Sequence, residues 1–126
     1  MEAVGMLKVK RVYEVKGADD GRRILVDRLW PRGLRRSEAA IDEWMKEVAP
    51  SDELRRWFGH REERWHQFRE RYRDELRAPG QMEILRQLAR DAQKGNVTIL
   101  YSAKDTERNN ARVLAGFISE LTGAGI

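Results

Sequence analysis

Residues 97–110 of the chain, VTILYSAKDTERNN, join a short apolar run to a polar loop. The run at 97–101 is rich in β-branched and aromatic side chains, and its length is typical of a buried strand. The polar residues that follow include Asp105 and Thr106, either of which can cap the start of a helix. The stretch therefore predicts a strand, a loop and a helix in succession, as in an α/β fold.

A second stretch, ILVDRLWPRGLRR at residues 24–36, has the same plan, because its apolar run ends abruptly in charged residues. If the two runs are strands of one sheet with their polar ends on the same side, these polar residues converge at one edge. Ligands of open α/β sheets bind at this edge, outside the carboxyl ends of the strands. The sequence therefore places a candidate site there without naming a reaction.

The start of the chain adds a further strand. Residues 7–15, LKVKRVYEV, alternate apolar and basic side chains, which is typical of a half-exposed strand. The short link at residues 16–21, KGADDG, ends in Asp-Gly, so the local pattern favours an antiparallel hairpin with the strand at 24–26. A parallel pair would normally need a longer crossover.

Apolar side chains at helical spacing predict four helices between the second and third strands. They are predicted at residues 37–49, 51–59, 61–77 and 81–94. Ser37 can cap the first of them, and Pro50 stops it. A last helix follows the third strand and ends at Gly123. The order predicts a single small α/β domain over residues 1–126, with a short sheet flanked by helices.

The composition limits the function classes. Lysine and arginine number 25 against 21 acidic residues, a net charge of +4, and the pI is about 9.7. Arginine, the commoner base, suits bidentate contact with phosphate or carboxylate, whereas the interspersed acidic residues argue against a polyanion-binding tail. The lack of cysteine excludes disulfides, thiolate catalysis and cysteine-based zinc sites. Met1 precedes no apolar signal core and no run could span a membrane, which predicts a cytoplasmic protein.

The first functional hypothesis is an anion site at the polar edge of the sheet. The helix predicted to start at Thr106 would offer free N–H groups and the positive end of its dipole. The residues predicted to bind the ligand are Arg28, Trp30, Arg32, Gly33, Ser102, Asp105, Asn109 and Asn110. In the alternative interpretation, Ser102 and Asp105 cap the helix while the arginines pair with helical carboxylates. The chain lacks the glycine pattern of a standard nucleotide cradle.

The second hypothesis concerns Asp27 and Lys104, two ionisable residues at neighbouring strand ends. A lysine in a closed site can have a lowered pKa and act as a base or nucleophile. Asp27 would then orient the lysine or serve as a general base, which makes these two residues the catalytic candidates. The alternative is a structural salt bridge that fixes the two loops.

Histidine and tryptophan give weaker signals. His60 and His66 are six apart, which is no metal spacing, so no metal site is predicted and no cofactor follows. Structural capping of the short helix at 51–59 is the simpler role for His60. Trp30 lies in a loop before proline, where its ring could stack on a ligand or on Arg32.

Four sequence blocks resemble a known family. They are VDRLWPRG at 26–33, APS-x-ELRRWFGH at 49–60, RW-x-x-F-x-x-RY at 64–72 and LYSAKD-x-x-x-NNA at 100–111. In this order and spacing they are similar to the YeaO-like family, which belongs to domain-of-unknown-function group 488. The resemblance implies an α/β fold with a largely parallel sheet, which conflicts with the hairpin predicted from the local pattern. It implies no established function.

A larger related branch of the same group carries cysteines in the loop after its last strand and a Cys-His-Arg near the next helix. This chain has Ser102 in that loop and Asn109-Asn110-Ala111-Arg112 near the helix start. Thiol chemistry or metal binding suspected for that branch therefore does not carry over.

Three functions remain open on the sequence alone. The first is a pocket for a small phosphate or carboxylate ligand, in which Arg28, Arg32 and Lys104 hold the anion and which could belong to an enzyme. The second is a nucleic-acid-associated protein that uses its basic surface, and the third is a non-catalytic interaction module. The ligand, the reaction and the oligomeric state do not follow from the sequence.

Overall fold

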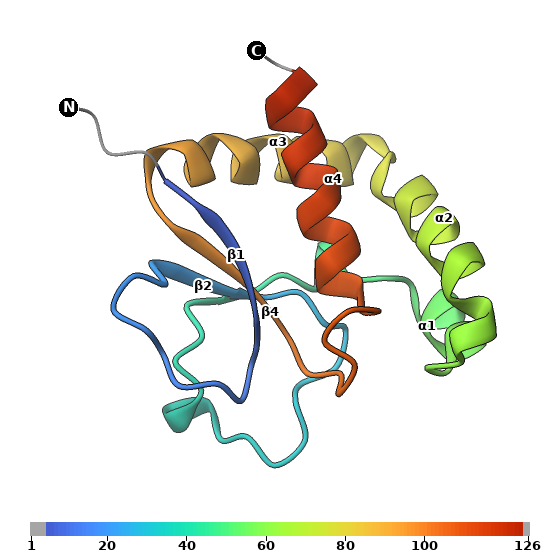
Figure 1. The fold of residues 1–126 in the computed structure, drawn as a ribbon, viewed down its shortest axis with the longest axis horizontal. Helices are drawn as coiled ribbons and strands as arrows, with labels where there is room; N and C mark the ends of the chain where they lie inside the picture. The colour runs from blue at the N-terminus through green and yellow to red at the C-terminus, as the bar shows by residue number, and fades with distance from the viewer. Residues whose placement is uncertain (1–4, 125–126) are drawn as a thin grey trace.

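A four-stranded parallel sheet forms the centre of the computed structural model, which describes residues 5–124 (Figure 1). Its strands are β1 (Leu7–Arg11), β2 (Arg22–Leu25), β3 (Glu43–Trp44) and β4 (Val97–Tyr101). Their spatial order is β1-β4-β2-β3, and all five residues of β4 are buried. This confirms the α/β class and the buried strand at 97–101. The expectation that no apolar signal core follows Met1 rests partly on residues 1–4, which lie outside the described range.

The predicted hairpin of β1 and β2 is wrong. Both strands pair in parallel with β4, which lies between them, so that Val97 faces Leu7 on one side and Arg22 on the other. The reason is that a strand buried at every position is best placed with a neighbour on each side. β4 comes some seventy residues later in the chain, and the local turn pattern carries no information about it. The parallel sheet implied by the family resemblance is confirmed.

Four helices accompany the sheet in residues 5–124. They are α1 (Asp52–Phe58), α2 (Trp65–Leu76), α3 (Pro79–Lys94) and α4 (Asn110–Ala124), and short 3-10 turns occupy Arg36–Glu38, Lys46–Val48 and Glu62–Arg64. Ser51 caps α1 by accepting a hydrogen bond from the Leu54 N–H at 3.1 Å. The Ser51 N–H and hydroxyl both donate to the Glu75 carboxylate of α2, at 2.8 and 2.6 Å. These bonds tie the start of α1 to α2.

The helix predicted at 37–49 is wrong, because this segment contains β3 between two short 3-10 turns. The Met45 N–H donates to the Leu25 carbonyl at 2.8 Å, so the backbone pairs with the sheet instead of with itself. The apolar residues that suggested one helical face in fact separate. Val48 joins the main core, whereas Trp44 packs on the opposite face of the sheet.

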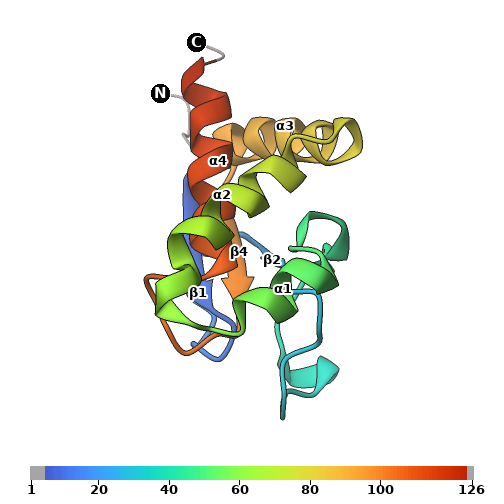
Figure 2. The same ribbon diagram turned by 90° about the vertical axis from the view of Figure 1, so that its right-hand side faces the viewer.

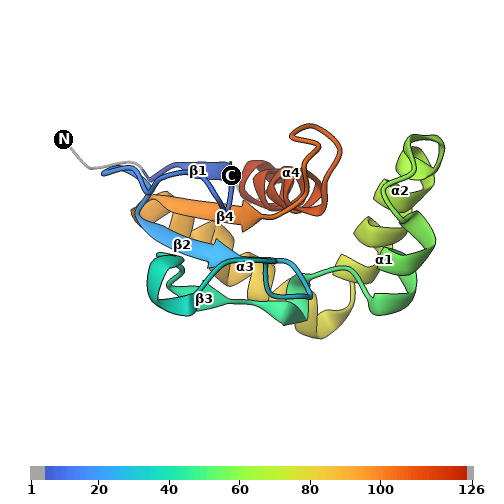
Figure 3. The same cartoon turned by 90° about the horizontal axis from the view of Figure 1, so that it is seen from below.

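The two faces of the sheet are covered differently. One face carries Ile24 and Ile99 and packs on apolar side chains from all four helices. The other face carries Leu25 and Leu100, and in residues 5–124 no helix contributes to its cluster. Loop residues close it instead, namely Trp30, Leu34 and Ile41, together with Trp44 of β3. Figure 3 shows α1 and α2 beyond the carboxyl ends of β2 and β4, and in Figure 2 these helices face the viewer.

A buried ion network ties the loop before β2 to this second face. Asp20 is 1% exposed and accepts hydrogen bonds from Arg23 at 2.5 Å, from Lys10 at 2.9 Å and from the Gly17 N–H at 2.9 Å. Arg23, also 1% exposed, donates through Nε to the Ala40 carbonyl at 2.8 Å. Burial alone would raise the pKa of Asp20, but the donors from Gly17, Lys10 and Arg23 hold it well below its usual value.

Gly21 follows this network at a position where the neighbouring backbone leaves no space for a Cβ atom. Its φ is +63°, and a Cβ there would collide with the Asn96 carbonyl, which accepts the Arg22 N–H at 3.1 Å. We expect Gly21→Ala to lower the free energy of unfolding by more than about 1 kcal/mol, because strain and the collision add. Urea unfolding measures the loss.

The matched control is Gly33→Ala. Gly33 also has a positive φ, +76°, but nothing lies within 4 Å of a Cβ built there. This variant carries the strain without the collision, so an equal loss in the two variants would show that the approach to Asn96 is not tight.

Within residues 5–124, none of the helices is long and apolar enough to cross a bilayer.

Candidate functional site

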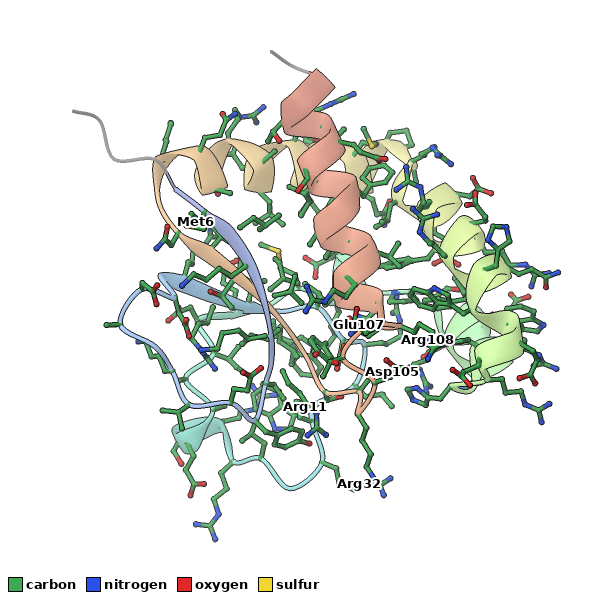
Figure 4. All side chains as sticks on the ribbon, viewed as in Figure 1. Met6, Arg11, Arg32, Asp105, Glu107 and Arg108 are labelled. Atoms are coloured by element: carbon green, nitrogen blue, oxygen red, sulfur yellow. The ribbon has the colours of Figure 1, made fainter. Side chains whose placement is uncertain are left out.

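A cavity of about 950 Å³ opens at the carboxyl ends of β2 and β4. It is lined mainly by three segments, which fall within residues 27–32, 50–60 and 102–110. All of the predicted site residues line it except Gly33. Figure 4 shows Arg11, Arg32, Asp105 and Arg108 grouped around this end of the molecule, with Met6 at the other end of β1. The predicted convergence of the two polar strand ends is therefore present, while ligand binding by these residues stays a prediction.

Asp27 joins three elements at the floor of the cavity. One carboxylate oxygen accepts hydrogen bonds from the Ser102 N–H at 2.9 Å and hydroxyl at 2.7 Å. The other accepts from Nδ2 of Asn110 at 3.0 Å, and the same amide donates to the Val26 carbonyl at 3.0 Å. The ends of β2 and β4 are thereby tied to the start of α4. Burial raises the pKa of Asp27 above its usual value, although the hydrogen bonds from Ser102 and Asn110 oppose the rise.

Lys104 is exposed on the cavity wall, and within residues 5–124 no ion pair of 4.0 Å or less joins it to Asp27. Neither the activated pair nor the structural salt bridge predicted for these residues is formed in this conformation. Ser102 and Asn110 supply the hydrogen bonds to the carboxylate instead. Catalytic roles for Asp27 and Lys104 stay predictions.

The loop before α4 is organised by its own polar side chains. Oδ1 of Asp105 accepts from the N–H groups of Glu107 at 2.9 Å and Arg108 at 3.0 Å, which closes a turn. Oδ1 of Asn109 accepts the Arg112 N–H at 2.9 Å and caps α4, which begins at Asn110. The helix start predicted at 106 is therefore wrong by four residues, because Asp105 favours a local turn first. The predicted stop at Gly123 is also wrong, since α4 runs to Ala124.

Trp30 is held by protein groups on several sides. Its Nε1 donates to the Leu34 carbonyl at 2.6 Å, and its ring meets that of Trp44 edge-on at 5.4 Å. The cation over the ring is the Arg36 guanidinium, 4.8 Å from the centroid. The arginine stacked on Trp30 is therefore Arg36 rather than the predicted Arg32.

Arg11 and Tyr13 are cavity residues that the sequence interpretation missed. Nε of Arg11 donates to the carbonyls of Ser102 and Ala103 at 3.2 and 2.9 Å. The hydroxyl of Tyr13 donates to the Arg32 carbonyl at 2.8 Å. The available signal was the change from apolar to charged residues at the end of β1. An antiparallel hairpin would have put that end at the opposite edge of the sheet.

His60 lines the cavity and has a positive φ angle, which is uncommon for a residue other than glycine. Gly59 ends α1 in the left-handed conformation, and His60 follows with φ +59°. The cap is therefore supplied by Gly59 rather than by His60, whose exposed side chain lines the cavity. Left-handed backbone at a residue other than glycine is costly and is often found at functional sites.

The cavity is strongly positive. Its lining holds seven arginine or lysine residues against two aspartates. Arg55 lies 3.4 Å from Asp52, Arg108 lies 3.1 Å from Asp105, and Arg28 lies 4.0 Å from Asp52. In the described part of the chain the other four cations have no carboxylate within 4.0 Å; they are Arg11, Arg32, Arg56 and Lys104. The predicted pairing with carboxylates thus applies to only part of this cluster.

Comparison with known proteins places the chain among relatives of similar length. It is 48% identical to the uncharacterized protein YeaO of Escherichia coli over 115 residues, which cover 91% of this chain and 98% of that protein. It is 40% identical to the uncharacterized protein Rv3073c of Mycobacterium tuberculosis over 113 residues, 90% of this chain and 93% of that one. No solved structure matches significantly.

A family model described as the inactive DUF488-N3 subclade matches residues 6–124, almost the whole described range. The blocks that suggested the YeaO-like family lie inside this match. The chain belongs to the inactive DUF488-N3 subclade, and its resemblance to YeaO-like proteins is confirmed.

Proposed function

We infer that the protein binds a small phosphate or carboxylate compound in the cavity at the carboxyl ends of β2 and β4. The observation that carries the proposal is the set of four cavity cations without a carboxylate within 4.0 Å in residues 5–124. Cations gathered in a cleft repel one another and attract a small anion. Arginine adds directionality, because its guanidinium bonds both oxygens of a phosphate or carboxylate.

The local chemistry supports binding rather than catalysis. Both oxygens of the Asp27 carboxylate accept hydrogen bonds, and the Ser102 hydroxyl is engaged with it at 2.7 Å. A serine nucleophile is normally activated by a neighbouring base that is oriented by a third group; here the serine bonds directly to the carboxylate. The family description of this subclade as inactive also supports a binding role.

Titration calorimetry with phosphate, sulfate and acetate tests the proposal. We expect Arg32→Ala and Lys104→Ala each to weaken binding of the preferred anion about tenfold, since a hydrogen bond to a charged group contributes about 1.5–3 kcal/mol. Arg35→Ala is the matched control, because Arg35 lies on the same loop with its side chain 82% exposed and outside the cavity lining.

Two outcomes would overturn the proposal. One is the absence of binding by every phosphate, sulfate and carboxylate compound tested. The other is an equal loss in the Arg35→Ala control, which would point to a diffuse surface charge. A single-stranded oligonucleotide included in the panel separates the nucleic-acid alternative, whose affinity would fall steeply with salt, whereas a single-anion pocket loses little.

A further inference from the structure

Exposed apolar side chains contribute to the lining of the cavity. Among the described residues, four large hydrophobic side chains are exposed; they are Met6, Tyr13, Val15 and Leu29. Two of these, Tyr13 at 42% and Leu29 at 56% exposure, line the same cavity. Single exposed hydrophobic residues need no explanation, but apolar surface gathered in a cleft with polar groups is typical of ligand sites.

The Tyr13 side chain is held by two contacts with the rest of the protein. Its hydroxyl is anchored to the Arg32 carbonyl at 2.8 Å, and the Arg11 guanidinium lies 4.7 Å from the ring centroid. Arg11 is itself held by the carbonyls of Ser102 and Ala103. A ring immobilised in this way loses little further conformational freedom when a ligand packs against it.

Cations adjoin this apolar surface. Arg11 lies over the Tyr13 ring, and Arg32 supplies the carbonyl to which that ring is anchored. Both belong to the cavity cations without a carboxylate within 4.0 Å in residues 5–124. The Tyr13 ring and the positive charge of Arg11 therefore lie side by side in the cavity, whose lining also includes Leu29 and the other cations. Inorganic phosphate would contact the charge but leave the ring in water.

We propose that the ligand carries a flat apolar ring joined to its anionic group, as in an aryl phosphate or an aryl carboxylate. The ring packs on Tyr13 and Leu29, and the anionic group meets Arg11, Arg32 and Lys104. A small molecule is favoured over a protein surface because Tyr13 and Leu29 line a cavity of about 950 Å³, a volume typical of small-molecule sites. This inference rests on the proposed anion site and narrows it to one ligand class.

Matched pairs of ligands test the ring directly. Phenyl phosphate is compared with methyl phosphate, and benzoate with acetate, by calorimetry at one pH and ionic strength. Within each pair the charged group is the same and only the ring differs. We expect the aryl member of the better-bound pair to bind about tenfold more tightly, because stacking on an aromatic side chain commonly contributes that much.

Substitutions in the cavity lining test where the ring of the ligand packs on the protein. Tyr13→Ala and Leu29→Ser should each bring the ratio of aryl to alkyl affinity closer to one, while Tyr13→Phe should keep most of it because the ring remains. Val15→Ser is the control, since Val15 is 88% exposed and does not line the cavity. Circular dichroism confirms that each variant is folded before its affinity is compared.

The failures of the two proposals are distinguishable. Equal affinities for the aryl and alkyl members would overturn the ring proposal and leave the anion site standing. An aryl preference that survives unchanged in both Tyr13→Ala and Leu29→Ser would also overturn it, because the ring would lie elsewhere. Absence of binding by all four compounds would remove the anion site together with this inference.

Discussion

Asp20→Ala is expected to lower the free energy of unfolding by about 3–5 kcal/mol, because it leaves a buried guanidinium without its counter-charge. Arg23 is 1% exposed and lies 2.5 Å from the Asp20 carboxylate, and Lys10 would lose the same partner. The Gly17 N–H would also lose its acceptor. Urea unfolding followed by circular dichroism measures the change.

Asp19→Ala is the control for this variant. Asp19 is the adjacent residue and pairs with Lys8, but its side chain is 75% exposed, so its removal should change stability little. Asp20→Asn provides a second measurement if the alanine variant does not fold, since the amide keeps the shape and one acceptor. A loss in Asp20→Asn no larger than in Asp19→Ala would contradict the assigned importance of the buried pair.

The pH dependence of stability follows from the same carboxylate. The pKa of Asp20 in the folded protein lies well below its usual value, so its contribution is fully present above the unfolded pKa of about 4. It is lost as the pH falls from there toward the folded pKa. Asp20→Asn should therefore show a smaller loss of stability below pH ~4 than the parent protein, because this carboxylate no longer takes up a proton on unfolding.

Asp27→Asn is expected to tighten anion binding by tenfold or more. Asp27 is one of two negative charges in a cavity lined by seven cations. A carboxylate ~6 Å from an anion costs about 3 kcal/mol at an effective dielectric constant of ~20, of which mobile salt removes part. Asparagine keeps an acceptor for Ser102 while losing the charge. Calorimetry with sulfate measures the gain, because sulfate keeps its charge over the accessible pH range.

Two controls accompany this variant. Asp91→Asn removes a charge from α3, outside the cavity lining, and should leave sulfate affinity unchanged. In the parent protein sulfate affinity should rise as the pH falls through the raised pKa of Asp27, and Asp27→Asn should lack this part of the rise. Weaker sulfate binding by Asp27→Asn would show that the carboxyl group contacts the ligand.

The parts of the fold that were predictable are those determined by neighbouring residues. The run at 97–101 is apolar except for Thr98 and is followed at once by polar residues, so its burial and the position of its carboxyl end follow from the local pattern. The span of the short helix predicted at 51–59, which contains α1, likewise depends on residues within one or two turns. The convergence of Asp27 with Ser102 and Asn110 then follows from placing two such strand ends at one edge.

The wrong predictions concern contacts between distant segments. The pairing of β1 and β2 depends on β4, which inserts between them, and no turn signal at residues 16–21 reveals it. The segment at 37–49 imitates a helical face because Trp44 and Val48 are four apart, yet they pack on opposite faces of the sheet. The first of these errors also concealed Arg11 and Tyr13, since it assigned the end of β1 to the wrong edge.

The ties at Asp27 and at Ser51 brace two walls of the cavity, and a hydrogen bond of 2.9 Å from Arg28 Nε to the Pro50 carbonyl joins these walls. One wall is the sheet edge, where Asp27 links β2, β4 and α4. The other is the pair α1 and α2, which Glu75 holds together through Ser51. Because the two walls are held at a set separation, we expect a ligand that touches both to be selected by its span as well as by its charge. Compounds too short to bridge the gap would contact one wall only.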